Sequence, residues 1–229
     1  MISIIISALN EEKNIAKVFN NLEIALIKFK YQYEIILIND GSKDNTKAKM
    51  EHLERIKGSN IVFINNKINK GIGFCIKQGV KNAKYKYILF HPSDGEISAK
   101  EILKNKKYLF KKDLIIPYPI NQKNSRTIFR FYLSNIYQTI LRVTFLKSIK
   151  YFNGTIIFNK KIINKFNIYS DTFFIFTEII LKYTKNNTNY IEVPYRLNKR
   201  LSGNSKALRL KNLLDIIRDY LKMLKYYYL

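Results

Sequence analysis

At 229 residues the chain is long enough for one α/β domain with a substantial core, whereas two independent domains would be cramped. Its single cysteine, Cys75, excludes an internal disulfide and fits a reducing compartment. The net charge of +24 favours polyanions, but we interpret most of it as a solvated, lysine-rich surface and do not expect a nucleic-acid partner.

The chain opens with a short apolar stretch, Ile2–Ser7, that we interpret as a strand. It is too short for the core of a signal peptide, so we expect no export signal. Two later apolar segments are interrupted by charges, at Arg130 and Arg142 in one and at Asp215 and Arg218 in the other. Neither is therefore expected to span a bilayer, and we expect a protein that is soluble or lies on a surface.

Apolar runs alternate with helical patterns through the first half of the chain. Strands are expected at Ile2–Ser7, Tyr33–Asn39, Asn60–Asn65, Tyr85–Phe90 and Asp113–Pro117. Apolar residues three and four apart predict intervening helices at Glu11–Lys30, Asp44–Lys57, Gly71–Lys84 and Ser98–Phe110. This order predicts an α/β fold with a mostly parallel sheet, helices on both faces and a ligand at the carboxyl ends of the strands.

The second half has longer amphipathic segments. We expect a long helix at Ser125–Ile149, a strand at Gly154–Asn159, a helix near Asp171–Thr184 and a strand at Tyr190–Val193. Residues 206–228 predict a second, basic amphipathic helix. We therefore divide the chain into an α/β domain over 1–205, with an amphipathic interface helix near 125–149, and a C-terminal basic helix over 206–229. For Ser125–Ile149, core packing is an equal alternative to a membrane-facing role.

Polar motifs follow three of the predicted strands. The first is Ser7-Ala8-Leu9-Asn10-Glu11, and the second is Asn39-Asp40-Gly41-Ser42-Lys43-Asp44-Asn45-Thr46. The third begins with the glycine turn Asn69-Lys70-Gly71-Ile72-Gly73, and the strand after its helix ends just before Asp94. Glycines allow close approach of the backbone, and a helix start supplies unpaired N–H donors, so these ends suit a nucleotide sugar or a phosphate.

In this order the motifs resemble those of the family 2 glycosyltransferases with the GT-A fold. Within that family they look like the polyprenyl-phosphate sugar transferases typified by dolichyl-phosphate mannose synthase. The narrower resemblance is carried by Glu192-Val193-Pro194 and by Arg200-Leu201-Ser202-Gly203-Asn204-Ser205-Lys206. The resemblance as a whole, from the first motif to the last, covers essentially the whole chain and implies a Rossmann-like sheet with peripheral amphipathic helices.

The resemblance implies which residues bind a nucleotide-sugar donor. They are Asn10, Glu11, Asn39, Asp40, Lys70, Gly71, Gly73 and Asp94. The family usually has Asp where this chain has Asn39, which keeps an acceptor and loses a charge. Taken alone, Asp40 and Ser42 could merely form a turn and cap a helix, but three such strand ends in order favour the site.

The metal motif of the family, Asp-x-Asp, is incomplete here. The matching residues are Pro92-Ser93-Asp94, so the first carboxylate is missing. Relatives often use a residue two positions further on, which is Glu96 in this chain. Asp94 and Glu96 are therefore the expected ligands of Mg²⁺ or Mn²⁺, together with the diphosphate of the donor. The nearby His91 is more simply a structural residue than a ligand.

For the acceptor, the resemblance implies a phosphate bound by arginine and serine side chains. The expected residues are Arg126, Arg130, Ser134, Arg200 and Ser205, because a guanidinium group pairs well with phosphate oxygens. Arg200 and Asp94 are expected to act in catalysis. Glu178 lies near where other family members place a general base, with an ordinary helix carboxylate as the alternative.

These features predict an inverting glycosyltransferase that moves a sugar to a polyprenyl phosphate. We expect it in the cytoplasm, at the inner face of a membrane, and leave open a membrane partner subunit or a homo-oligomer. One alternative is a family 2 enzyme that glycosylates a saccharide hydroxyl. Another, of a different class, is a noncatalytic protein that binds anionic lipid or nucleic acid.

Overall fold

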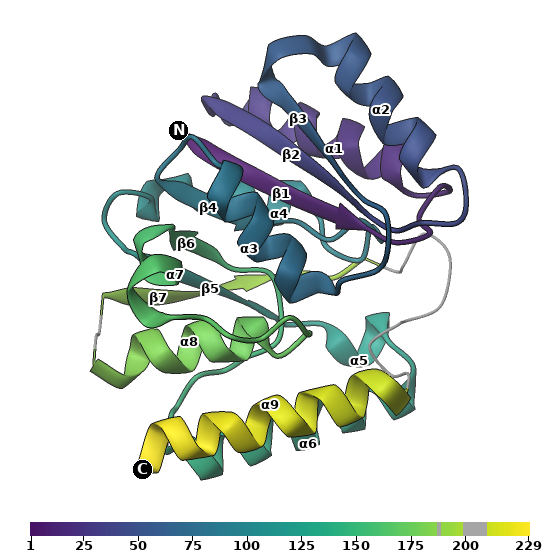
Figure 1. The fold of residues 1–229 in the computed structure, drawn as a ribbon. Coiled ribbons are helices and arrows are strands. Elements are labelled where there is room, and N and C mark those ends of the chain that lie inside the picture. The colour runs from purple at the N-terminus through teal and green to yellow at the C-terminus, as the bar shows by residue number, and fades with distance from the viewer. Residues whose placement is uncertain (187–188, 199–209) are drawn as a thin grey trace.

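A computed structural model describes residues 1–186, 189–198 and 210–229, and it contains one seven-stranded sheet covered by helices on both faces (Figure 1). The strands are β1 (Ile2–Ala8), β2 (Tyr33–Asp40), β3 (Ile61–Asn66), β4 (Tyr87–Phe90), β5 (Leu114–Pro119), β6 (Ile157–Asn159) and β7 (Tyr190–Tyr195). Their order in the sheet is β3-β2-β1-β4-β6-β5-β7. The predicted α/β fold with a mostly parallel sheet is confirmed.

The α-helices are α1 (Ile15–Lys28), α2 (Thr46–Lys57), α3 (Ile72–Asn82), α4 (Ala99–Leu103), α5 (Gln122–Ser125), α6 (Ile128–Phe145), α7 (Lys161–Phe166), α8 (Ile175–Asn186) and α9 (Leu210–Tyr228). Two short 3₁₀ segments, η1 (Gly58–Asn60) and η2 (Lys104–Tyr108), precede β3 and follow α4. Only β6 runs antiparallel to its neighbours, β4 and β5. The strands β1, β2 and β4 therefore end at one edge of the sheet, where the polar motifs follow them.

The two faces of the sheet carry separate hydrophobic cores. One core packs α1, α2 and α4 onto the sheet, with Phe19, Leu53 and Ile102 buried. The other packs α3, α6 and α8 onto the opposite face, and α9 closes it with Met223, which is wholly buried. Strands buried from both sides explain the near-continuous apolar runs of β1 and β2.

Several predicted helices have different limits in the structure. The helix expected at Ser125–Ile149 is shorter at both ends: α5 ends at Ser125, and α6 begins at Ile128 after Thr127 caps it and ends at Phe145. The helix expected at Ser98–Phe110 is α for only five residues and then tightens into η2. The helix expected from Asp171 begins at Ile175, because residues 169–172 form a loop. Apolar spacing alone does not mark such ends.

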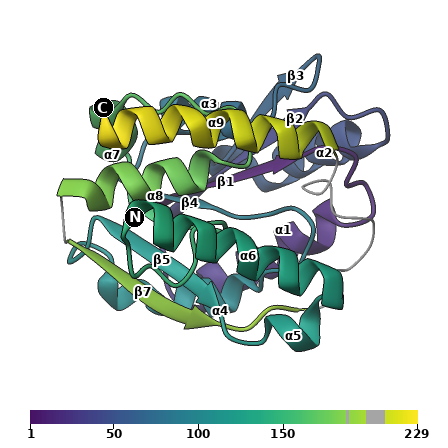
Figure 2. The same ribbon diagram turned by 90° about the horizontal axis from the view of Figure 1, so that it is seen from below.

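Helices α6 and α9 lie side by side on the outside of the second core (Figures 1 and 2). Tyr220 of α9 is hydrogen bonded to Thr144 of α6 at 2.8 Å, and its ring contacts that of Phe145. Both helices are amphipathic, as predicted. In the described part of the chain, no helix combines the length and the apolarity that crossing a membrane requires.

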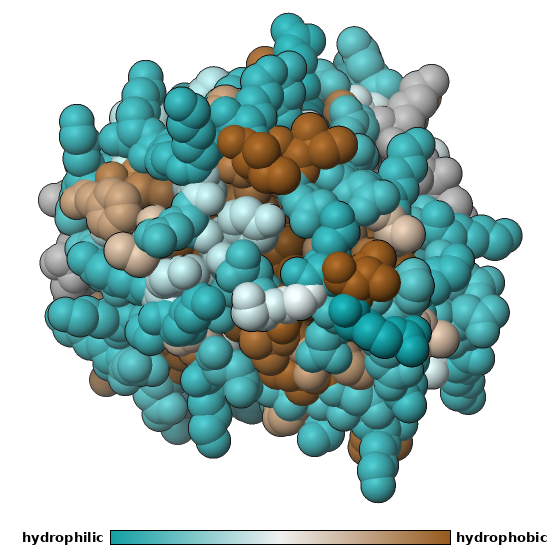
Figure 3. Space-filling view, turned by 90° about the horizontal axis from the view of Figure 1, so that it is seen from above, coloured by the Kyte–Doolittle hydropathy of each residue, from teal (hydrophilic) through white to brown (hydrophobic). Residues whose placement is uncertain are grey.

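Both helices present apolar side chains to the outside. On α6 these are Ile128, Phe129, Tyr132, Ile136, Ile140 and Val143; on α9 they are Leu210, Leu214, Ile217, Leu221, Tyr226 and Tyr228. The face seen from above in Figure 3, away from these helices, is mostly hydrophilic, with hydrophobic residues in separate small groups. The exposed apolar side chains of α6 and α9 thus lie on the side of the molecule opposite this face.

Candidate active site

The predicted donor residues all lie at the carboxyl edge of the sheet. Asn10 and Glu11 follow β1, and Asn39 and Asp40 end β2. Lys70 and Gly71 form the turn into α3, Gly73 lies in the first turn of that helix, and Asp94 follows β4. The tips of β1 and β2 are joined directly. Asn10 Oδ1 accepts a hydrogen bond from the Lys43 amide at 2.8 Å, and the Glu11 amide donates to Thr46 Oγ1 at 2.8 Å. The structure thus brings these residues together as one polar edge.

Asp40 is buried and holds the glycine turn. Its two carboxylate oxygens accept hydrogen bonds from the amides of Lys70, at 2.9 Å, and Gly71, at 3.0 Å. Asn66 donates to the same carboxylate at 3.3 Å. Asp40 therefore fixes the start of α3 relative to the end of β2, as well as lying where a nucleoside is expected.

A second segment explains why the turn needs glycine. Gly71 has φ 93°, and a Cβ atom on it would lie 2.4 Å from the Asp171 carbonyl oxygen. A Cβ on Gly73 would lie 2.4 Å from the Ser170 carbonyl oxygen, and the Gly73 amide donates to Asp171 O at 3.0 Å. We predicted close approach of a ligand at these glycines. The structure shows close approach of the protein's own backbone, from the loop at 169–172.

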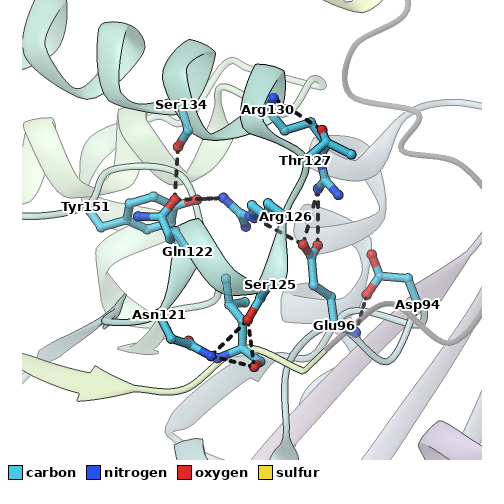
Figure 4. Close-up of polar contacts among 11 residues, drawn as sticks. Asp94, Glu96, Asn121, Gln122, Ser125, Arg126, Thr127, Arg130, Ser134 and Tyr151 are labelled. Carbon is cyan, nitrogen blue, oxygen red and sulfur yellow. Dashed lines mark hydrogen bonds and ion pairs between the residues drawn. The ribbon is translucent and has the colours of Figure 1, made fainter.

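The loop after β4 contains a buried histidine and two carboxylates. Burial lowers the pKa of His91 to about 4, so its imidazole is neutral at pH 7. Its Nδ1 has no hydrogen-bond partner among the residues that the structure describes. Asp94 is partly buried and accepts a hydrogen bond from the Glu96 amide at 3.0 Å. The turn formed by this bond directs the next side chain, Glu96, toward α5 and α6 (Figure 4).

Glu96 is held by two arginines (Figure 4). Arg126 Nε lies 3.1 Å from Glu96 Oε1, and Arg130 Nη2 lies 3.3 Å from each of the two carboxylate oxygens. The side chains of Glu96 and Arg126 are 9% and 11% exposed. An ion pair this shielded from water is screened less than a surface pair. The contact therefore ties the β4 loop to the start of α6.

A further set of polar side chains orients Arg126. Its Nη1 donates to Gln122 Oε1 at 2.9 Å and to the Tyr151 hydroxyl at 3.1 Å. Ser134 donates to the same Gln122 oxygen at 3.3 Å. Burial acts against the charge of Arg126, but the neighbouring Tyr151 and Glu96 raise the pKa of its guanidinium above the ordinary value. Three of the predicted acceptor residues are thus gathered in one cluster.

This arrangement bears on the expected metal ligands. A hard divalent cation requires several anionic or neutral oxygen ligands, and two guanidinium groups on one carboxylate take up its oxygens and oppose a cation electrostatically. Glu96 therefore does not fit a metal ligand in this geometry. Among the described residues no group of three His, Cys, Asp or Glu side chains is arranged to hold a metal.

Glu178 has a different environment from the one expected for a base. It is completely buried, and its oxygens accept hydrogen bonds from the amides of Tyr169, at 3.0 Å, and Ser170, at 2.9 Å. Lys182 Nζ lies 2.7 Å from the same carboxylate. These contacts support the alternative interpretation of Glu178, as a carboxylate that shapes the loop at 169–172.

Two predicted residues, Arg200 and Ser205, lie outside the described residues. Three residues of the site were not predicted, because no motif pointed to them. They are Gln122 and Tyr151, beside Arg126, and Asp219 of α9, which is buried against the loop at 169–172. For Gln122, the sequence offers its four-residue spacing from Arg126, Arg130 and Ser134, which is typical of one helix face, although α5 and α6 are separate helices in the structure.

Residues 3–192 match the family model described as Glycosyl transferase family 2. An uncharacterised protein of Methanocaldococcus jannaschii is 38% identical over 109 residues, which are 46% of this chain and 45% of that protein. The dolichyl-phosphate beta-glucosyltransferase of Dictyostelium discoideum is 33% identical over 106 residues, which are 44% of this chain and 32% of that protein. The matched segments thus span less than half the length of either relative.

Among solved structures, the chain is similar to glucosyl-3-phosphoglycerate synthase from Mycobacterium tuberculosis in complex with Mn²⁺, uridine diphosphate and phosphoglyceric acid. The TM-score is 0.65 at 15% identity, over 98% of this chain and 77% of that one. At this identity the likeness shows the fold alone. The predicted GT-A fold is confirmed.

Proposed function

The chain belongs to glycosyl transferase family 2, and from this premise we propose that it transfers a sugar from a nucleotide diphosphate to a polyprenyl phosphate, with inversion, at a membrane surface. The donor would lie along the polar edge formed by Asn10, Glu11, Asn39, Asp40 and the glycine turn. Its diphosphate would point toward Asp94. The name of the Dictyostelium relative, a dolichyl-phosphate glucosyltransferase, supports a lipid-phosphate acceptor.

One observation carries the choice of acceptor. Arg130 pairs with Glu96 beside the donor loop, and it lies on the same helix as the exposed apolar row that begins with Ile128 and Phe129. A lipid phosphate has an anionic head and an apolar chain. The two arginines fit the head, and the outward face of α6 fits the chain or the surrounding lipid. Ser134 lies one turn further along α6, within reach of the same cluster.

The proposed transfer depends mainly on aligning the acceptor phosphate with the anomeric carbon of the donor sugar. An oxygen of the acceptor phosphate attacks the anomeric carbon, a C–O bond forms there, and the bond from that carbon to the donor's diphosphate breaks on the opposite side. The acceptor phosphate is already ionised near neutral pH, so no strong general base is needed. Burial of Glu178 is consistent with this route. Arg126 and Arg130 would hold the attacking group in place.

Mg²⁺ or Mn²⁺ would bind together with the donor, because the oxygens of its diphosphate are hard ligands for such a cation. The Mn²⁺ and uridine diphosphate in the mycobacterial structure support that class of donor. The proposed location is the cytoplasmic face of a membrane, with α6 and α9 in the headgroup layer. The proposed domain division remains residues 1–205 and 206–229, and Arg200 and Ser205 remain proposed acceptor ligands.

An acceptor comparison tests the proposal. Purified protein is given radiolabelled nucleotide sugars and either a short-chain polyprenyl phosphate, the matching polyprenyl alcohol or a set of oligosaccharides. Transfer to the phosphate alone is the expected result. Transfer to an oligosaccharide hydroxyl would instead identify an enzyme that glycosylates saccharide hydroxyls, and the lipid-phosphate acceptor would be rejected. Salt-sensitive binding to anionic vesicles or nucleic acid, without transfer or donor hydrolysis, would indicate a noncatalytic protein.

A further inference from the structure

Helix α9 carries a buried carboxylate that no part of the proposed reaction uses. Asp219 is 2% exposed, and its Oδ2 accepts hydrogen bonds from Ser170 Oγ, at 2.7 Å, and Thr172 Oγ1, at 2.9 Å. Its backbone oxygen accepts a third from the Tyr169 hydroxyl at 2.8 Å. The partner on its own helix, Arg218, is mostly exposed and lies 3.4 Å from Oδ1. The bonds of Asp219 are therefore directed mainly at the loop at 169–172.

The same loop is fixed from a second side by α8. Glu178 accepts hydrogen bonds from two of its amides, and Lys182 is paired with Glu178. The backbone amides are thus bound by one buried carboxylate, and the side-chain hydroxyls by another. These hydrogen bonds favour a single conformation of the loop at 169–172, because a shift of the loop would leave a buried carboxylate without its donors.

The loop in turn packs on the glycine turn of the donor edge. The carbonyl oxygens of Ser170 and Asp171 occupy the space that Cβ atoms on Gly73 and Gly71 would need, and the Gly73 amide is bound to Asp171. Lys77 of α3 adds bonds to the loop, at 2.8 Å to the Asp171 carboxylate. On its other side the turn is bound by Asp40. The turn is therefore clamped between Asp40 and a loop that Asp219 holds.

We propose that Asp219 is a positioning residue for the nucleotide-sugar donor. By fixing the hydroxyls of Ser170 and Thr172, it sets where the carbonyls at 170–171 lie, and these set the position of the amides at the start of α3. Helix α9 thereby belongs to the donor site as well as to the outer surface. This role rests on the donor half of the proposed function and is independent of the acceptor.

The test uses full-length protein and separates positioning from simple anchoring of α9. Asp219→Asn removes the charge that the loop hydroxyls bind. Tyr220→Phe is the matched control, because it removes a hydrogen bond between α9 and Thr144 of α6 and leaves the hydrogen bonds of Asp219 to the loop in place. Ser170→Ala removes one contact from the loop side. For each variant, the affinity for uridine and guanosine diphosphates is measured by calorimetry, and the melting temperature by calorimetric scan.

Asp219→Asn is expected to weaken nucleotide binding roughly 2- to 30-fold, the range typical of residues that act on a site through others. Ser170→Ala should weaken it in the same direction, and the double variant should be less impaired than the two losses combined, because the residues share one bond. Tyr220→Phe should keep the nucleotide affinity within about twofold of wild type, even if its melting temperature falls. If Asp219→Asn does not fold, the nucleotide affinity of Ser170→Ala alone tests the proposal: a loss supports it and an unchanged affinity rejects it.

Unchanged nucleotide affinity in Asp219→Asn, or an equal loss in Tyr220→Phe, would overturn the role of Asp219 while the proposed function stands. Failure of the wild-type chain to bind either nucleotide would instead remove the donor half of the proposed function, and the role with it. Weaker nucleotide binding in the variant, with no transfer by wild type to polyprenyl phosphate, would support the role and reject the acceptor.

Discussion

Arg126 Nε lies 3.1 Å from Glu96 Oε1, and this ion pair joins the loop that follows β4 to the segment that leads into α6. The loop contains the donor-side carboxylate Asp94, and α6 begins with the exposed residues Ile128 and Phe129. The donor and acceptor sides of the proposed reaction therefore meet at one charged contact. Substitutions on the two sides of this contact should therefore affect the nucleotide-sugar donor and the acceptor phosphate differently.

Arg130→Ala should raise the KM for polyprenyl phosphate roughly ten- to hundredfold, the effect of losing one charge-assisted contact. Donor affinity should stay unchanged. Arg130→Lys should recover part of the loss, because it keeps the charge without the planar fork. Arg142→Ala is the matched control: this arginine lies on the same helix, and its side chain is hydrogen bonded to Thr139, away from Glu96. A loss of donor affinity in Arg130→Ala would place Arg130 in the donor site.

Glu96→Gln should lower the KM for the acceptor phosphate, because the phosphate no longer competes with a carboxylate for the two guanidinium groups. The concentration of Mg²⁺ or Mn²⁺ needed for half-maximal nucleotide binding should change less than about twofold, since Glu96 is engaged by arginines. Titration of the cation in calorimetric nucleotide-binding measurements checks this. A markedly higher cation requirement would restore Glu96 as a metal ligand.

Asp94→Ala should reduce transfer by about 10²-fold or more, the scale on which removal of one preorganised electrostatic group acts. Its melting temperature should remain near that of wild type, because Asp94 is only partly buried. Single-turnover transfer with radiolabelled donor measures the effect, with Asp215→Asn on α9 as a control for loss of a carboxylate elsewhere. Normal turnover in the Asp94 variant would refute its place in the site.

Replacing Phe129 and Ile136 of α6 by Ser should weaken binding to anionic vesicles by about tenfold or more, because these exposed apolar side chains would be buried in the membrane interface on binding. Ile24→Ser with Ile27→Ser is the matched control, since both residues are 64% exposed but lie on α1, on the other face of the sheet. Vesicle sedimentation at low and high salt measures the binding. An equal loss in both double variants would argue against α6 as the membrane-facing helix.

The buried His91 predicts an acid-sensitive fold. Its pKa is lowered to about 4 by burial, whereas in the unfolded chain it is about 6.5. Between these values the unfolded chain binds a proton that native His91 does not, so the free energy of unfolding should fall as the pH drops from about 6.5 to about 4. Denaturant unfolding across this range measures it. His91→Gln should lose this part of the pH dependence; a slope equal to wild type would show that other groups cause it.

The sheet, the amphipathic helices and the three polar strand ends could be predicted from local patterns in the sequence. Alternating apolar runs and 3.6-residue patterns are local, and the carboxyl ends of parallel strands must meet at one edge. That rule alone gathers Asn10, Glu11, Asn39, Asp40 and Asp94 at the same edge of the sheet. Helix ends were less predictable, as at the break between α5 and α6, because capping contacts such as that of Thr127 decide them.

The contacts that these residues make could not be predicted before the fold was known. Glu96 and Arg126 are 30 positions apart, Gly73 meets a loop near Ser170, and that loop is held by Asp219 a further 49 positions along. No local pattern encodes such pairs, because they exist only after the sheet and both helix layers have packed. Burial explains the pairs themselves: a carboxylate removed from water needs a cation or a hydrogen-bond donor, and residues distant in the sequence supply it only in the folded chain.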